Sequence, residues 1–210
     1  MNGNPFSSNL SGNFAFSMLG NGFPRGALGV LCGKEGSGKS EVVCRFLAEN
    51  TSLKTAWIED SLTVYPAALE QKGVALDRVL FVEGADQSLW CMHQILRSHL
   101  FQVVVHTVRP RRLRKRELAL NEDEVSLRRL QIAAEKAGAL VLFLSEAPFP
   151  ASWPLAVQIE VSRFFPHTTH VGVPAVAVPV EVEIAFNILK YRGQRVWKTS
   201  PNVLKASPAF

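Results

Sequence analysis

Continuous apolar runs alternate with amphipathic stretches along the first two thirds of the chain. The apolar runs are Ala27–Cys32, Thr55–Ile58, Val79–Val82, Val103–Val105 and Ala139–Leu144. Such runs are typical of strands buried on both faces of a parallel sheet. The stretches between them carry apolar residues at helical spacing, at Ser40–Ala48, Pro66–Lys72, Ser88–Leu100 and Glu124–Ala137. The alternation predicts an α/β fold, a mainly parallel sheet flanked by helices.

The pattern changes after Ser145, because no helical stretch separates the remaining extended segments. These segments are Leu155–Ser162, Pro179–Lys190 and Arg195–Lys198. They predict a C-terminal antiparallel extension of the sheet. We therefore expect one domain at residues 25–198, with a loosely packed lead-in at residues 1–24 that is rich in Asn, Ser and Gly. A flexible tail is expected at residues 199–210.

Composition narrows the class of protein. The 210 residues carry a net charge of +5, which permits a polyanionic partner without requiring one. The three cysteines, Cys32, Cys44 and Cys91, have no close spacing, so neither a disulfide framework nor a cysteine zinc site is indicated. Free thiols fit a reducing compartment. The chain opens on no signal-peptide pattern and has no apolar run long enough to span a membrane, so we expect a cytoplasmic protein.

A glycine-rich motif follows the first apolar run and opens the first helical stretch. It matches the pattern G-x-x-x-x-G-K-[ST] in full and consists of Gly33, Lys34, Glu35, Gly36, Ser37, Gly38, Lys39 and Ser40. Glycines allow such a loop to turn its amide groups inward toward phosphate oxygens, and the helix N-terminus adds partial positive charge. In a loop of this kind, Lys39 would reach the β- and γ-phosphates and Ser40 would ligate Mg²⁺. The motif predicts ATP and Mg²⁺ as cofactors.

A basic run follows the apolar run Val103–Val105. It places six cations within eight residues: Arg109, Arg111, Arg112, Arg114, Lys115 and Arg116. The carboxyl edge of a parallel sheet is where α/β folds bind ligands, so the run is a candidate contact for DNA or for a protein partner. The alternative to a ligand contact is a solvated charge cluster that is neutralised by the acidic residues Glu122–Glu124. No aromatic residue is interleaved, which gives no support for base stacking.

The surroundings of the glycine-rich loop resemble bacterial RecA. The resemblance rests on Gly22–Gly26 before the first strand, on the loop itself, and on Trp57–Ser61 with Tyr65-Pro66 after it. It implies a RecA-like P-loop NTPase core. In RecA, the connection that corresponds to the basic run carries a DNA-contacting loop. A second such loop is missing here, because only Ala147–Pro154 separates the relevant strands.

A closer resemblance is to ImuA, the shortened, SulA-like relative of RecA in bacterial mutagenesis cassettes. It rests on the short chain, on the entry Pro24-Arg25-Gly26, and on Leu127–Glu135 followed by Gly138–Leu140. The resemblance implies a role in SOS-induced translesion DNA synthesis. It also implies RecA and a Y-family polymerase-like protein as partners.

Three positions depart from a RecA-type ATPase. His106 stands where an acid is expected, at the end of the strand beside the loop. Ser61 aligns with the water-activating glutamate, and Glu146 aligns with the γ-phosphate-sensing glutamine. Of the neighbouring acids, Asp60 is a better candidate than Glu59 to aim at the phosphate. We expect ATP binding with weak or no hydrolysis. A working DNA-dependent ATPase of recombinational repair and a SulA-like inhibitor of a polymerising partner are the alternatives, and the intact loop counts against the second.

Overall fold

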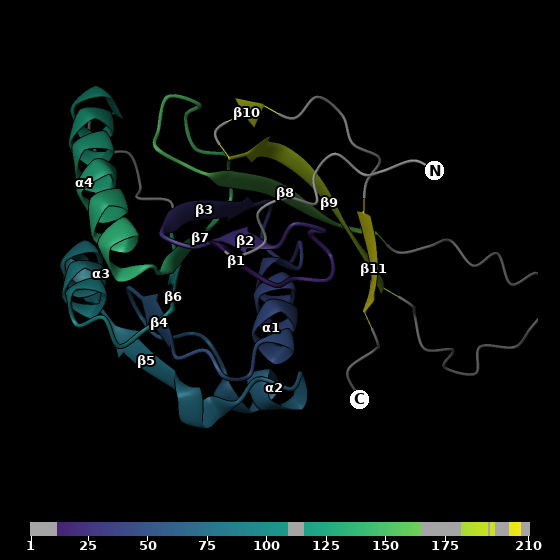
Figure 1. Cartoon of the computed structure of the whole chain (residues 1–210). Helices are drawn as coiled ribbons and strands as arrows, with labels where there is room; N and C mark the ends of the chain where they lie inside the picture. The colour runs from purple at the N-terminus through teal and green to yellow at the C-terminus, as the bar shows by residue number, and fades with distance from the viewer. Residues whose placement is uncertain (1–11, 109–115, 165–181, 193, 196–201, 207–210) are drawn as a thin grey trace, which may run out of the picture.

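The computed structural model describes residues 12–108, 116–164, 182–192, 194–195 and 202–206 (Figure 1). A central sheet carries helices on both faces. Its strands are β3 (Ala27–Cys32), β4 (Thr55–Glu59), β5 (Val79–Glu83), β6 (Val103–Thr107), β7 (Leu140–Ser145), β8 (Val157–Phe164), β9 (Val182–Tyr191), β10 (Gln194–Arg195) and β11 (Asn202–Ala206). Within the described residues, the sheet has the order β10-β9-β8-β3-β7-β6-β4-β5, and β11 pairs with β9.

The strands and helices predicted from Ala27 to Leu144 are present, and the fold class is the expected one. Of the predicted segment Arg195–Lys198, only Arg195 lies within the described residues. The strands from β8 through β3, β7, β6 and β4 to β5 are all parallel. Every residue of β3 and β7 is buried, as their continuous apolar sequences indicate. The helices are α1 (Lys39–Glu49), α2 (Pro66–Gln71), α3 (Ser88–Arg97) and α4 (Arg116–Ala137), with short 3₁₀ turns at η2 (Leu76–Arg78) and η3 (Ala85–Gln87).

Two apolar layers enclose the sheet. On one face, buried side chains of α1, including Val42, Val43 and Phe46, pack against the sheet together with Leu69 of α2. On the other face, α3 and α4 contribute Met92, Leu96 and Leu130. Figure 1 shows α3 and α4 side by side, away from α1 and α2. In the part of the chain that the structure describes, no helix is both long and apolar enough to cross a membrane.

Strand β8 differs from the expected antiparallel extension, because it lies parallel to β3. The connection from β7 therefore returns along the sheet without a helix. Aromatic side chains, and not a helix, pack this connection against the sheet. The Phe149 ring lies 5.6 Å from that of Phe143 and 4.9 Å from that of Trp153. The antiparallel extension begins only with β9, which pairs with β8.

Both ends of the chain are more ordered than expected within the described residues. In the lead-in, β1 (Asn13–Phe14) pairs antiparallel with β2 (Phe23–Pro24). Phe14, Phe16 and Phe23 are buried, and their rings lie 5.1–6.3 Å from that of Phe46 on α1. The loose packing expected for the lead-in is thus wrong for these residues, because the phenylalanines complete the core on that face. In the expected flexible tail, β11 is paired to β9 along its whole length.

Candidate nucleotide-binding site

The glycine-rich motif forms the turn between the end of β3 and the start of α1. Gly36 and Gly38 have φ values of 74° and 96°, in the left-handed region that glycine adopts without strain. The Gly33 amide donates to the Ser145 carbonyl oxygen at 3.1 Å, which ties the loop to the end of β7. The loop is therefore fixed at the carboxyl edge of the parallel sheet, with the N-terminus of an 11-residue helix behind it.

Lys39 is held over the loop by the loop's own backbone. Its ammonium donates to the Gly33 carbonyl oxygen and to the Lys34 carbonyl oxygen, the latter at 2.9 Å. Burial lowers the pKa of Lys39, and the nearby Glu146 carboxylate is the largest opposing influence. The ammonium is thus partly desolvated at the site where a phosphate would be bound.

A pocket of about 790 Å³ opens beside the loop and runs toward α2. Of the eight predicted loop residues, Gly36, Ser37, Lys39 and Ser40 line it together with Glu35 and Gly38, whereas Gly33 and Lys34 do not. The buried Ser37 hydroxyl has no hydrogen-bond partner among the described residues. A buried polar atom without a partner costs about 1–3 kcal/mol, which a ligand oxygen would relieve. The loop amides, Lys39 and Ser40 therefore fit a nucleoside polyphosphate with Mg²⁺.

Glu59, at the end of β4, carries the buried carboxylate of this pocket. It is 4 % exposed and accepts hydrogen bonds from the Thr63 amide (2.5 Å), the Thr63 hydroxyl (2.9 Å) and the Val64 amide (3.2 Å). Trp57 Nε1 and the Thr107 hydroxyl donate at 3.2 and 3.1 Å. Burial by itself would raise the pKa of Glu59, but these donors hold it below its ordinary value. The carboxylate is ionised and fully engaged.

The preference for Asp60 as the acid that aims at the phosphate is not supported by the structure. Asp60 accepts a hydrogen bond from the Ser88 hydroxyl at 2.7 Å, at the start of α3, whereas Glu59 lines the pocket. Neighbouring residues of a strand point to opposite faces, and the face toward the loop belongs to Trp57 and Glu59.

The alternation of side chains also applies at the end of β6, where an acid was expected to hold the Mg²⁺ shell. His106 is 7 % exposed, faces Ile58 O at 3.2 Å from its Nδ1, and packs edge-on against Phe143. Burial lowers its pKa, which keeps the imidazole neutral at pH 7. Thr107, not His106, lines the pocket. The strand beside the loop was also assigned wrongly: β7 lies between β3 and β6.

Arg163 and Lys72 are charged side chains of the pocket that were not predicted from the sequence. Arg163 of β8 and Lys72 after α2 line it, and Lys72 forms an ion pair with Glu41 of α1. Glu146 also lines the pocket, directly after the residue that anchors the loop. Arg163 lies two residues after the buried Val161, so both side chains point to the same face of β8. This spacing indicates the pocket only once β8 is known to lie beside β3.

The basic run lies outside the described residues from Arg109 to Lys115. Arg116 begins α4, and its side chain is also outside the description. The structure therefore describes the two ends of this connection, the carboxyl end of β6 and the start of α4. Contact with DNA or with a partner remains a prediction for these residues.

Fold and loop together define an α/β protein of the P-loop class. Neither a family model nor a curated protein sequence matches the chain. Among solved structures, the chain is similar to the RadB recombinase, with 16% sequence identity over 88% of this chain and 90% of that one and a TM-score of 0.57. The fold is therefore RecA-like.

Proposed function

We propose that this protein is a RecA-like nucleotide-binding accessory protein of SOS-induced translesion DNA synthesis and DNA repair. It binds ATP with Mg²⁺, hydrolyses it slowly or not at all, and acts through protein partners. The observation that carries the nucleotide part is the position of Lys39, which stands over a glycine-rich loop at the mouth of a pocket of about 790 Å³. The RecA-like fold and the resemblance to ImuA support the role in DNA repair, with RecA and a Y-family polymerase-like protein as proposed partners.

Different residues of the pocket would bind different parts of the nucleotide. The loop amides and Lys39 would hold the phosphates, and Ser40 would hold Mg²⁺, which shields phosphate charge when bound. Tyr65 lines the pocket at the α2 side, where its exposed ring offers a face for a nucleobase.

Slow hydrolysis is supported by the state of the pocket carboxylate. A general base works best when its pKa lies near the operating pH. Glu59 has the opposite property, because five hydrogen bonds from four residues hold its pKa low. His106 is directed toward Ile58 and Phe143 and does not line the pocket. A steady-state turnover of about 1 s⁻¹ or faster, with or without single-stranded DNA, would favour the alternative of a working ATPase.

The proposed ligand is tested by replacing Lys39 with alanine. We expect at least a tenfold loss of ATP affinity in calorimetry with Mg²⁺, because a charge-assisted hydrogen bond contributes about 1.5–3 kcal/mol. Lys54→Ala is the matched control, since Lys54 is an exposed lysine that does not line the pocket. Equal ATP affinity in the wild type and Lys39→Ala would rule out this function for the loop.

Glu146 is expected to set the preference between di- and triphosphate. Its carboxylate shares the pocket with Lys39 and would repel the additional charge of a γ-phosphate. Glu146→Gln should therefore raise ATP affinity several-fold while changing ADP affinity less, as measured by calorimetry with each nucleotide. The control Glu160→Gln removes an exposed carboxylate from β8 that does not line the pocket. An equal change for both nucleotides would contradict a γ-phosphate-directed effect.

A further inference from the structure

The outer face formed by α3 and α4 carries apolar side chains that the fold does not use. Met92 and Leu96 of α3 and Leu130 of α4 already cover the sheet and are fully buried. On the outer face, Trp90 is 60 % exposed, Val125 51 % and Ile132 52 %. Single exposed apolar residues are ordinary, so their meaning depends on whether they lie together.

The two helices that carry these side chains cover the same face of the sheet. Helices α3 and α4 pack against each other, and each leads into one of the adjacent parallel strands β6 and β7, so both run in the same direction. His93 of α3 lies near enough to Arg129 of α4 for their charges to interact. Trp90 lies about one turn before His93 on α3, and Val125 lies about one turn before Arg129 on α4.

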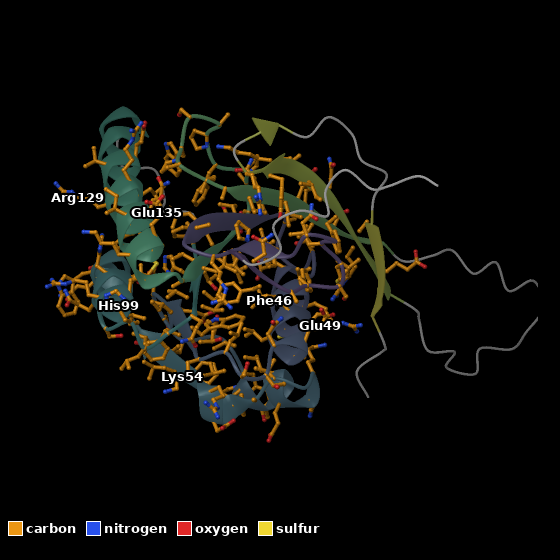
Figure 2. The ribbon with its side chains drawn as sticks, in the orientation of Figure 1. Phe46, Glu49, Lys54, His99, Arg129 and Glu135 are labelled. Carbon is orange, nitrogen blue, oxygen red and sulfur yellow. The ribbon has the colours of Figure 1, made fainter. Side chains whose placement is uncertain are left out.

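Arg97 lies about one turn after His93 on α3, and Ile132 lies about one turn after Arg129 on α4. Trp90, His93 and Arg97 follow one another at spacings of three and four residues, which puts them on one face of α3. We call the set of Trp90, His93, Arg97, Val125, Arg129 and Ile132 the α3–α4 surface. Figure 2 shows the Arg129 side chain directed away from the sheet.

The α3–α4 surface is positively charged. Helix α3 contains no acidic residue. On the described part of α4, Glu124 is paired with Arg128 at 2.8 Å, and Glu135 accepts a hydrogen bond from Gln131 at 2.8 Å. Arg97 and Arg129 are exposed, and the described side chains of the two helices offer them no such carboxylate. Burial lowers the pKa of His93, and the charges of Arg129 and Arg97 lower it further.

From these observations we propose that the α3–α4 surface binds an acidic, amphipathic helix of a partner protein. Large apolar side chains of that helix would pack on Trp90, Val125 and Ile132, and its carboxylates would pair with Arg97 and Arg129. The apolar residues favour a protein over a nucleic acid, because phosphates gain nothing from exposed Val and Ile side chains. The proposal rests on the proposed function in one respect, that the protein acts through protein partners.

The test uses the full chain and a fluorescently labelled synthetic peptide of about 20 residues. The peptide carries Leu and Phe at i, i+3, i+4 and i+7 and Glu at most other positions. A peptide of equal composition with its apolar residues spread around the helix is the comparison, and a single-stranded oligonucleotide is the competitor. We expect saturable binding of the amphipathic peptide by anisotropy, and at least a tenfold weaker affinity for Trp90→Ala combined with Arg129→Ala.

Controls separate this inference from the proposed function. Arg45→Ala removes an exposed arginine on α1, on the opposite face of the sheet, and should leave peptide affinity unchanged. The double variant should bind ATP like the wild type, which also shows that it is folded. Absence of peptide binding, equal binding of the two peptides, full displacement by the oligonucleotide, or an unaffected double variant would each overturn the inference. None of these outcomes alters the ATP-binding test at Lys39.

Discussion

Glu59→Gln is expected to lower the free energy of unfolding by about 3 kcal/mol, which makes this carboxylate one of the most important polar groups of the fold. Each hydrogen bond to a charged group contributes about 1.5–3 kcal/mol. Glutamine keeps one acceptor oxygen and turns an amide donor toward the hydrogen-bond donors on Trp57, Thr63, Val64 and Thr107. Denaturant unfolding followed by circular dichroism gives the measurement. Glu70→Gln, at an exposed site on α2, is the control and should change stability by less than about 0.5 kcal/mol.

The pH dependence of this difference identifies its origin. The pKa of Glu59 is lower in the folded chain than in the unfolded chain, so its stabilisation is present above the ordinary value of about 4.3. It is lost as the pH falls through the lower folded value. The stability gap between the wild type and Glu59→Gln should thus be full at pH 7 and shrink below about pH 4. A gap that is constant with pH would contradict a role for the ionised carboxylate.

Gly33→Ala is expected to damage both stability and nucleotide binding. A Cβ at this position would lie 2.3 Å from the Val161 carbonyl oxygen of β8 and 2.8 Å from the Ser37 hydroxyl. Backbone must move to relieve such a contact, at a cost of about 1–3 kcal/mol. The move displaces a residue that holds both Ser145 and Lys39, so ATP affinity should fall as well.

Thermal unfolding and calorimetry on the same preparation measure the two effects. Gly20→Ala is the matched control, because a Cβ there would meet no atom within 4 Å. If Gly33→Ala kept wild-type stability and affinity, the close contact between the loop and β8 would be wrong.

The sequence was sufficient for the fold class because its apolar runs are continuous. The predicted strand Ala27–Cys32 has the bounds of β3, and the predicted helix at Ser40–Ala48 differs from α1 by one residue at each end. A strand that is buried on both faces can be recognised from its continuous run of apolar residues. The lead-in was misjudged because Asn, Ser and Gly dominate its composition, whereas Phe14, Phe16 and Phe23 decide its packing.

The candidate site was predicted in part, for a reason of geometry. The loop motif is local, so its place between a strand and a helix follows from its neighbours. Glu59 and Thr107 come from strands that are distant in sequence, and their meeting depends on the sheet order and on which face each side chain takes. A shift of one residue along a strand moves a side chain from the pocket to the other face of the sheet, which is why Asp60 was preferred to Glu59 incorrectly. The parallel direction of β8 depends on a connection that folds back through aromatic packing, a feature without a sequence period.

The resting position of Lys39 determines how a phosphate enters the site. Its ammonium donates hydrogen bonds to two carbonyl oxygens of the loop, which ties Gly33 and Lys34 to the start of α1. Entry requires the Lys39 side chain to exchange these carbonyl oxygens for phosphate oxygens, so a change of its rotamer accompanies binding. Binding at this end of the pocket therefore includes an exchange of hydrogen-bond partners by one side chain, and the affinity for phosphate reflects the difference between the two sets of hydrogen bonds.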